Sequence, residues 1–232
     1  MLRRRRLSSR SAVVIGNPAF DRVAQPDTSA RTRQLFGINV APLPGAEQEA
    51  KEIASILGVS PILGDSATEE KVKSLISPKV LHIATHGYFM EGEGPAYLRS
   101  GLLLAGAAVW NEFYPPPGVE DGRLTAREVS AMNLWGTQLV VLSACETGLG
   151  DITGEGLYGL QRAFLEAGAL AVIATLWPID DTATKELMTR FYQNWLKAGE
   201  KAEIETVFAE KLKDFRRRYR EPYYWGAFVL MR

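Results

Sequence analysis

The stretch VVLSACETGLG (residues 140–150) joins an apolar run to a glycine-rich turn. Apolar runs of this length, bounded by turn residues, are typical of strands that are covered on both faces. The run leads into Cys145, which is the only cysteine among the 232 residues. The pattern therefore predicts a buried strand whose end presents a single thiol at the edge of an open turn.

Segments of strand and helix character alternate on both sides of this stretch. The strand-like runs lie at 11–16, 79–87, 100–106, 138–143, 170–176 and 223–230. Helix-period segments lie at 46–58, 156–167, 182–199 and 202–219, and two more begin with capping-box patterns at Ser66–Glu69 and Thr125–Glu128. Residues 107–123 show no periodicity and are predicted to form a surface loop. The alternation predicts an α/β fold in which helices cover both faces of a mostly parallel sheet.

The composition is that of an ordinary soluble globular protein, with 46% apolar and 23% charged residues. No apolar run is long enough to span a membrane, so no membrane partner is expected. Basic residues interleaved with aromatics do not continue through the chain, so no nucleic-acid partner is expected either. A single cysteine allows no intrachain disulfide, which fits a reducing, cytoplasmic location.

The chain is predicted to form one domain over residues 11–232, preceded by a basic tail over residues 1–10. The tail, MLRRRRLSSR, has the basic flank of a secretory signal but lacks its apolar segment. Charge runs of this kind are usually solvated and flexible. The sequence therefore does not favour export.

Two of the predicted strands end in residues that can carry chemistry. One ends in Thr85-His86-Gly87 and the other in Ala144-Cys145-Glu146. If the strands are parallel, both ends lie at the same edge of the sheet, where open α/β sheets bind their ligands. A thiol beside an imidazole is suited to nucleophilic acyl transfer, because the base raises the thiolate fraction. This pattern makes His86 and Cys145 candidate catalytic residues.

Structural interpretations of the same residues stay open on pattern alone. A single cysteine on an apolar strand is most often a small buried hydrophobe, and a histidine at a strand end is often only a hydrogen-bonded polar group. His82 and His86 do not form a metal site, because four strand residues separate them by about 13 Å. With no cysteine cluster to add ligands, no metal is expected.

A glycine motif, Gly154-Glu-Gly156-Leu-Tyr-Gly159, matches the GxGxxG pattern of dinucleotide-binding sites. That fingerprint needs its first glycine directly after a strand, whereas about ten residues intervene here. The glycines are better explained by close packing at the start of a helix. No cofactor is therefore expected.

Taken in order, a set of segments along nearly the whole chain resembles the CHAT domain, a branch of the caspase-like cysteine peptidases related to caspases, metacaspases and separase. The segments are LPGAEQEAKEIASILG, VLHIATHGYF, SGLLLAG, DGRLTAREV, LVVLSACETGLGD, GEGLYGLQRAFLEAGALAVIATLWPIDD and PYYWGAFVL. The resemblance implies a caspase-like three-layer α/β/α sandwich around a mostly parallel sheet. It implies a cysteine endopeptidase that works through a thioester acyl-enzyme.

The resemblance also assigns roles to individual residues. Cys145 would be the nucleophile and His86 its partner, with an oxyanion hole formed by the backbone N–H groups of Gly87 and Cys145. Trp177 would belong to the loop that lines the substrate cleft. CHAT proteins often carry helical repeats ahead of this domain, so repeats of the tetratricopeptide type would belong to an activating partner chain or to a longer protein.

Substrate preference is predicted from acidic residues in the loops at the active end, namely Glu146, Asp151, Glu155, Asp180 and Asp181. Such a group of charges would favour a basic residue before the cleaved bond of a protein or peptide substrate. The alternative is that Asp180 and Asp181 cap the following helix and the others are solvated. A second hypothesis for the whole chain is a catalytically silent interaction or signalling module with the same fold.

Overall fold

A computed structural model describes residues 11–21, 34–35, 38–90, 95–109, 117–146, 154–177, 179–199 and 202–232. At residues 34–35, 38–39, 96, 144–146 and 154–158 it describes the backbone alone. The predicted basic tail, residues 1–10, lies outside the described residues.

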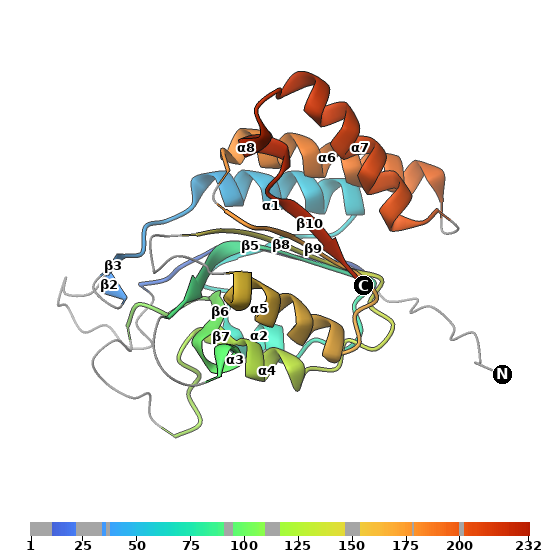
Figure 1. The fold of residues 1–232 in the computed structure, drawn as a ribbon. Coiled ribbons are helices and arrows are strands. Elements are labelled where there is room, and N and C mark those ends of the chain that lie inside the picture. Colours follow the sequence, from blue (N-terminus) through green and yellow to red (C-terminus); the bar gives the residue numbers. More distant parts are fainter. Residues whose placement is uncertain are drawn as a thin grey trace.

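One sheet forms the middle layer of the molecule (Figure 1). Along its main path the strands follow the order β10-β9-β8-β5-β1-β4. The five neighbours from β9 to β4 are mutually parallel, whereas β10 is antiparallel to β9. Their bounds are β1 (Val13–Pro18), β4 (Ile62–Gly64), β5 (Val80–Phe89), β8 (Leu139–Glu146), β9 (Val172–Thr175) and β10 (Phe228–Met231). The mostly parallel sheet predicted from the sequence is confirmed.

Shorter antiparallel strands extend this sheet at the end of β5. Strand β6 (Ser100–Leu103) pairs with the last residues of β5, and β7 (Arg123–Thr125) pairs with β6. A separate two-stranded sheet is formed by β2 (Gln34–Leu35) and β3 (Ile38–Asn39).

Helices cover both faces of the sheet and complete the predicted three-layer arrangement (Figure 1). One face carries α1 (Pro44–Leu57), α6 (Asp181–Ala198), α7 (Ile204–Arg218) and α8 (Pro222–Trp225). The other carries α2 (Glu69–Lys73), α3 (Ala96–Arg99), α4 (Ala126–Ser130) and α5 (Gly154–Glu166). Across the described part of the chain, no helix combines the length and the apolar character that a membrane crossing requires.

The sheet divides the hydrophobic core into two parts because successive strand residues point to opposite faces. Leu81 and Ile83 of β5 pack toward α4 and α5, in a cluster that includes Phe164. On the opposite face, Val141 of β8 belongs to the cluster that includes Phe191 of α6. All ten residues of β5 are buried, as expected for a central strand.

Two predictions of local structure are wrong in detail. Residues 107–123 are not wholly a surface loop, because Ala107 and Ala108 are fully buried beside Phe20. The final apolar segment is not one strand, since Pro222–Trp225 forms the short helix α8 and the strand begins only at Phe228.

The two predicted capping boxes have different outcomes. Thr125 and Glu128 form the reciprocal box at the start of α4. At α2 the cap is Thr68 rather than Ser66, and its hydroxyl accepts the N–H of Lys71. Glu69 is not part of a box; it is buried, and its carboxylate accepts the N–H of Gly122.

Candidate active site

The register of β5 and β8 brings the two candidate catalytic residues together. The strands pair in parallel from Val80 with Leu139 to Gly87 with Glu146, and within this ladder His86 lies directly opposite Cys145. Neighbouring strands are separated by about 4.8 Å, and paired positions of parallel strands share one face of the sheet. The backbone of Cys145 therefore lies beside that of His86 at the carboxyl end of the sheet, where ligands bind in open α/β folds.

The imidazole of His86 is held in a defined orientation. Its Nε2 lies 2.8 Å from the carbonyl oxygen of Ala41, and its ring lies 4.9 Å from the ring of Phe20, centre to centre. Because a carbonyl oxygen can only accept, Nε2 must carry the proton of this hydrogen bond. A neutral His86 would then carry its basic lone pair on Nδ1.

The segment that carries the Ala41 carbonyl is held by Asn17 at the end of β1. The Asn17 side chain accepts the backbone N–H of Leu43 at 2.7 Å and donates to Glu47 of α1 at 3.0 Å. Asn17 adopts a positive φ of 43°, a conformation that asparagine tolerates better than most residues. The contact fixes the entry of the chain into α1 two residues after Ala41.

The structure also locates the residues assigned to the oxyanion hole. Gly87 has a register partner on each side, Glu146 of β8 and Leu102 of β6. Its amide therefore lies within the sheet rather than in a loop. The role of Gly87 and Cys145 as oxyanion donors stays a prediction.

Among the predicted substrate-binding residues, the structure describes the side chains of Asp180 and Trp177 only. Asp180 is the N-cap of α6, where its carboxylate accepts the N–H of Ala183 at 3.0 Å. Asp180 therefore caps the helix, as the alternative interpretation of the sequence predicts. Its contact with a substrate stays a prediction. Glu146 and Glu155 are described only as backbone, in β8 and α5, and Asp151 lies outside the described residues.

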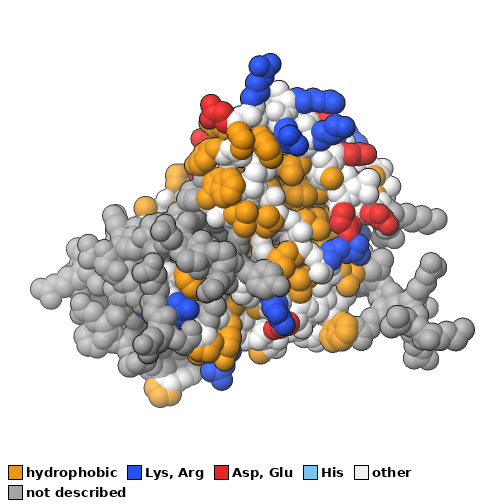
Figure 2. Space-filling model, in the orientation of Figure 1, with side chains coloured by type: hydrophobic (Ala, Val, Ile, Leu, Met, Phe, Trp, Pro, Cys, Tyr) orange, Lys and Arg blue, Asp and Glu red, His pale blue; other side chains and the backbone are white. Residues whose placement is uncertain are grey.

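Trp177 follows β9 and joins the carboxyl end of the sheet to the C-terminal segment. Its indole N–H donates to the carbonyl of Tyr223 at 2.8 Å. Figure 2 shows hydrophobic side chains gathered over the region of α8 and β10, where Tyr223 is 50% exposed. The loop assigned to the cleft thus borders an apolar face of the molecule.

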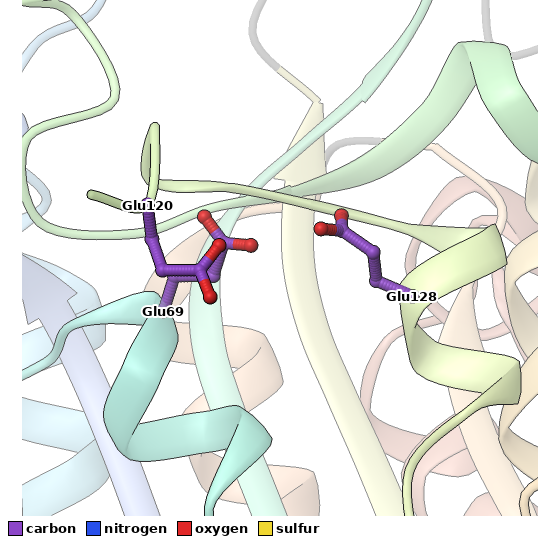
Figure 3. Close-up of side chains that lie close together, drawn as sticks. All are labelled: Glu69, Glu120 and Glu128. Carbon is purple, nitrogen blue, oxygen red and sulfur yellow. The ribbon is translucent and has the colours of Figure 1, made fainter. Parts of the chain in front are cut away.

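Three carboxylates on the opposite face of the sheet are close enough to be considered as a metal site. Oxygens of Glu69, Glu120 and Glu128 lie within 4.8 Å of one another, and Figure 3 shows the side chains approaching from α2, from the segment before β7 and from α4. The ammonium of Lys73 already lies among them, at 3.3, 2.8 and 3.1 Å respectively. We therefore assign the cluster as a structural network in which Lys73 binds three carboxyl groups.

This network is expected to make the free energy of unfolding depend on pH. Burial, together with the negative charge of Glu128, raises the pKa of Glu69 to about 8, although Lys73 acts in the opposite direction. An unfolded chain would release this proton near pH 4.3. The stabilising contribution of the protonated Glu69 is therefore complete below about pH 4.3 and is lost as pH rises toward 8.

We expect Glu69→Gln to remove this pH dependence. Urea unfolding between pH 5 and 8 should show a flatter decline in the free energy of unfolding than in the parent protein. The exposed neighbour Glu70 is the matched control, since Glu70→Gln should leave the decline unchanged. An equal decline in the Glu69→Gln variant would contradict the assignment.

Sequence reasoning found the two strand ends but missed the groups that orient His86. The carbonyl of Ala41 has no residue-type signal, because every residue has a carbonyl. Phe20 lies outside every strand-like and helix-period segment of the sequence. Both reach His86 only through the tertiary fold.

Comparison with known proteins supports the family resemblance seen in the sequence. The family model described as "CHAT domain" matches residues 1–232. Tetratricopeptide repeat protein 28 of Mus musculus is 31% identical over 246 residues, and its Homo sapiens counterpart is 30% identical over 246 residues. Each match covers 97% of this chain but only 10% and 9% of the relatives, so the chain spans about a tenth of their length.

Solved structures show the same fold at low sequence identity. The Arg specific cysteine proteinase gingipain R aligns over 95% of this chain and 45% of its own, with a TM-score of 0.53 and 11% identity. A complex of Porphyromonas gingivalis RgpB pro- and mature domains aligns over 95% and 46%, with a TM-score of 0.52 and 9% identity. The predicted caspase-like α/β/α architecture is confirmed.

Proposed function

Because this chain belongs to the CHAT domain family, we propose that it is a cysteine endopeptidase whose nucleophile is Cys145 and whose general acid and base is His86. The observation that carries the proposal is the ladder register that pairs these two positions on adjacent parallel strands. The hydrogen bond from His86 to the Ala41 carbonyl supports it, because an oriented imidazole is what proton transfer requires.

In the proposed mechanism, the thiolate of Cys145 attacks the carbonyl carbon of the scissile peptide bond. The resulting oxyanion accepts hydrogen bonds from nearby backbone N–H groups, for which Gly87 and Cys145 are the proposed donors. Protonated His86 then gives its proton to the leaving amine, and the C–N bond breaks to leave a thioester. His86 next takes a proton from water, whose oxygen attacks the thioester carbon. The C–S bond breaks, which releases the carboxylic acid product and regenerates the Cys145 thiolate beside protonated His86.

The substrate in this proposal is a protein or peptide with a basic residue before the cleaved bond. A basic substrate residue would be attracted by the acidic residues predicted at this end of the sheet, namely Glu146, Asp151, Glu155 and Asp180. Trp177 is proposed to border the cleft. Because both curated relatives are tetratricopeptide repeat proteins, a repeat segment of that kind is the proposed activating partner. A reducing, cytoplasmic setting belongs to the proposal, since the thiol must stay reduced.

The experiment that tests the dyad is alkylation of the native protein with iodoacetamide as a function of pH. Cys145 is the only cysteine, so the signal has one source. We expect the labelling rate to reach half its maximum well below pH 8.5, the ordinary value for a thiol, and expect His86→Ala to return it to that value. Slow labelling that does not depend on His86 would contradict an assembled dyad and would favour the silent interaction module.

A further inference from the structure

Glu49 is a buried carboxylate on the face of α1 that packs against the sheet. It is 3% exposed and stands among the apolar residues Ala46, Ala50 and Ile53. A charged group in such surroundings is costly unless polar partners compensate for its lost hydration. Its partners come from the two strands that carry the candidate dyad.

The carboxylate of Glu49 contacts both strands at once. One oxygen, Oε2, accepts a hydrogen bond of 2.8 Å from the hydroxyl of Ser143 in β8. The other, Oε1, lies 3.3 Å from Nε2 of His82 in β5, and both side chains are buried. Glu49 is thus hydrogen-bonded to β8 through one oxygen and lies within 3.3 Å of the His82 ring of β5 through the other.

Helix α6 closes the network on its other side. Nδ1 of His82 lies 3.3 Å from the hydroxyl of Tyr192, whose side chain is fully buried. Burial, reinforced by the negative charge of Glu49, raises the pKa of Tyr192 well above its usual value. Tyr192 therefore remains an uncharged phenol, able to donate to His82.

These contacts lie on the face of the sheet that contains the candidate dyad. Ser143 precedes Cys145 by two residues, and His82 precedes His86 by four. Because side chains alternate along a strand, even separations keep the positions on one face. Ser143 and Cys145 are about 7 Å apart along the strand, and His82 and His86 about 13 Å.

We propose that Glu49 is a positioning residue that ties β5 and β8 to one carboxylate and thereby sets the placement of Cys145 relative to His86. The proposal rests on the proposed function, in which these two residues react together. A hydrogen bond to a carboxylate is stronger than one between neutral groups, and low polarity strengthens it further. A single rigid anion on α1 therefore resists sliding of one strand against the other just before the reacting positions.

The variants that test this separate the charge from the contact. Glu49→Gln keeps the size of the side chain and an oxygen acceptor for Ser143, but removes the charge that faces His82. Ser143→Ala removes only the link to β8 and serves as the second variant if Glu49→Gln does not fold. Glu52→Gln is the matched control, because Glu52 lies on the same helix but bonds to Thr189 of α6.

The first measurement is amide hydrogen exchange of the β5–β8 ladder in the full chain. In Glu49→Gln and Ser143→Ala, we expect amides at 85–87 and 144–146 to exchange at least about tenfold faster, while amides at 80–82 and 139–141 keep their protection. Glu52→Gln should leave both ends unchanged. This measurement reports on strand positioning whether or not the protein cleaves peptides.

The second measurement is the pH profile of Cys145 alkylation in the same variants. We expect the His86-dependent part of the rate to fall about ten- to a hundredfold in Glu49→Gln and Ser143→Ala, since small displacements of reacting groups have effects of this size. In Glu52→Gln the profile should match that of the parent protein.

The outcomes distinguish the proposal from a merely structural role. The positioning role of Glu49 is overturned if the folded variants show unchanged amide exchange at 85–87 and 144–146. It is also overturned if protection falls uniformly along the whole sheet while the alkylation profile stays that of the parent protein. If His86→Ala leaves alkylation of the parent protein unchanged, the proposed dyad fails. Hydrogen exchange alone then decides whether Glu49 positions the strands. Faster exchange confined to 85–87 and 144–146 supports this role, and unchanged exchange overturns it.

Discussion

Cys145→Ala is expected to lower peptide-bond cleavage by at least about 10⁴-fold while the protein keeps its fold. The reason is that the proposed reaction passes through a thioester, which alanine cannot form. The change removes one sulfur atom at the end of β8 and leaves the ladder from Leu139 to Ser143 untouched. The measurement is cleavage of a peptide library that carries each amino acid before the scissile bond, in the presence of the relatives' tetratricopeptide repeat segment.

His86→Ala provides the second arm of this test. It removes the proton donor and acceptor but keeps the thiol, so it should lower cleavage by a comparable factor, as is usual for residues that act as a unit. The thermal midpoint and circular dichroism of both variants should show that they remain folded. Cleavage that survives in Cys145→Ala would disprove the covalent mechanism, and a library without preference for Arg or Lys would remove the proposed specificity.

Phe191→Ala is expected to be the most destabilising substitution considered, lowering the free energy of unfolding by about 3–5 kcal/mol. Phe191 of α6 is fully buried, in the core cluster that also contains residues of α1, α7 and the sheet. Its ring stacks on that of Trp195 at 6.0 Å and meets that of Phe208 edge-on at 5.6 Å. Alanine would remove these ring contacts and leave a cavity in a core that closes only partly.

The measurement is urea unfolding monitored by fluorescence. Leu196 on the same helix is the matched control, because it is 46% exposed and its replacement by alanine should change the free energy of unfolding by only about 0.5 kcal/mol. Typical domains are stable by about 5–15 kcal/mol, so this loss would be a large fraction of the free energy of unfolding. Equal effects of the two substitutions would contradict the described packing of α6.

Local pattern was sufficient for the elements that carry the strongest periodicity. The apolar run at 79–87 became β5, and the run at 138–143 became the start of β8. A fully buried parallel strand needs side chains that are apolar on both faces, and this requirement is visible in any short window of sequence. The same holds for the capping box of Thr125 and Glu128, whose partners lie within one helical turn.

The pattern was least informative where burial competes with local preference. The segment PYYW has the aromatic content of a strand, yet it forms α8, which begins with a proline at its first turn. Glu49 stands at the spacing of the buried face of α1, next to Ala50 and four residues before Ile53. A charged residue on the buried face of a helix indicates that a polar side chain of the neighbouring layer lies opposite it.

By itself, the sequence determined the α/β class, the positions of the main parallel strands along the chain and the two strand ends where His86 and Cys145 stand. Only the tertiary structure decided which groups surround them. The carbonyl of Ala41 reaches His86 across 45 residues, and Glu49 reaches Ser143 across 94. Periodicity indicates which side of an element is buried, because the preference of a residue for burial depends on its own side chain. It cannot report which distant group lies opposite, because that pairing exists only once the layers have packed.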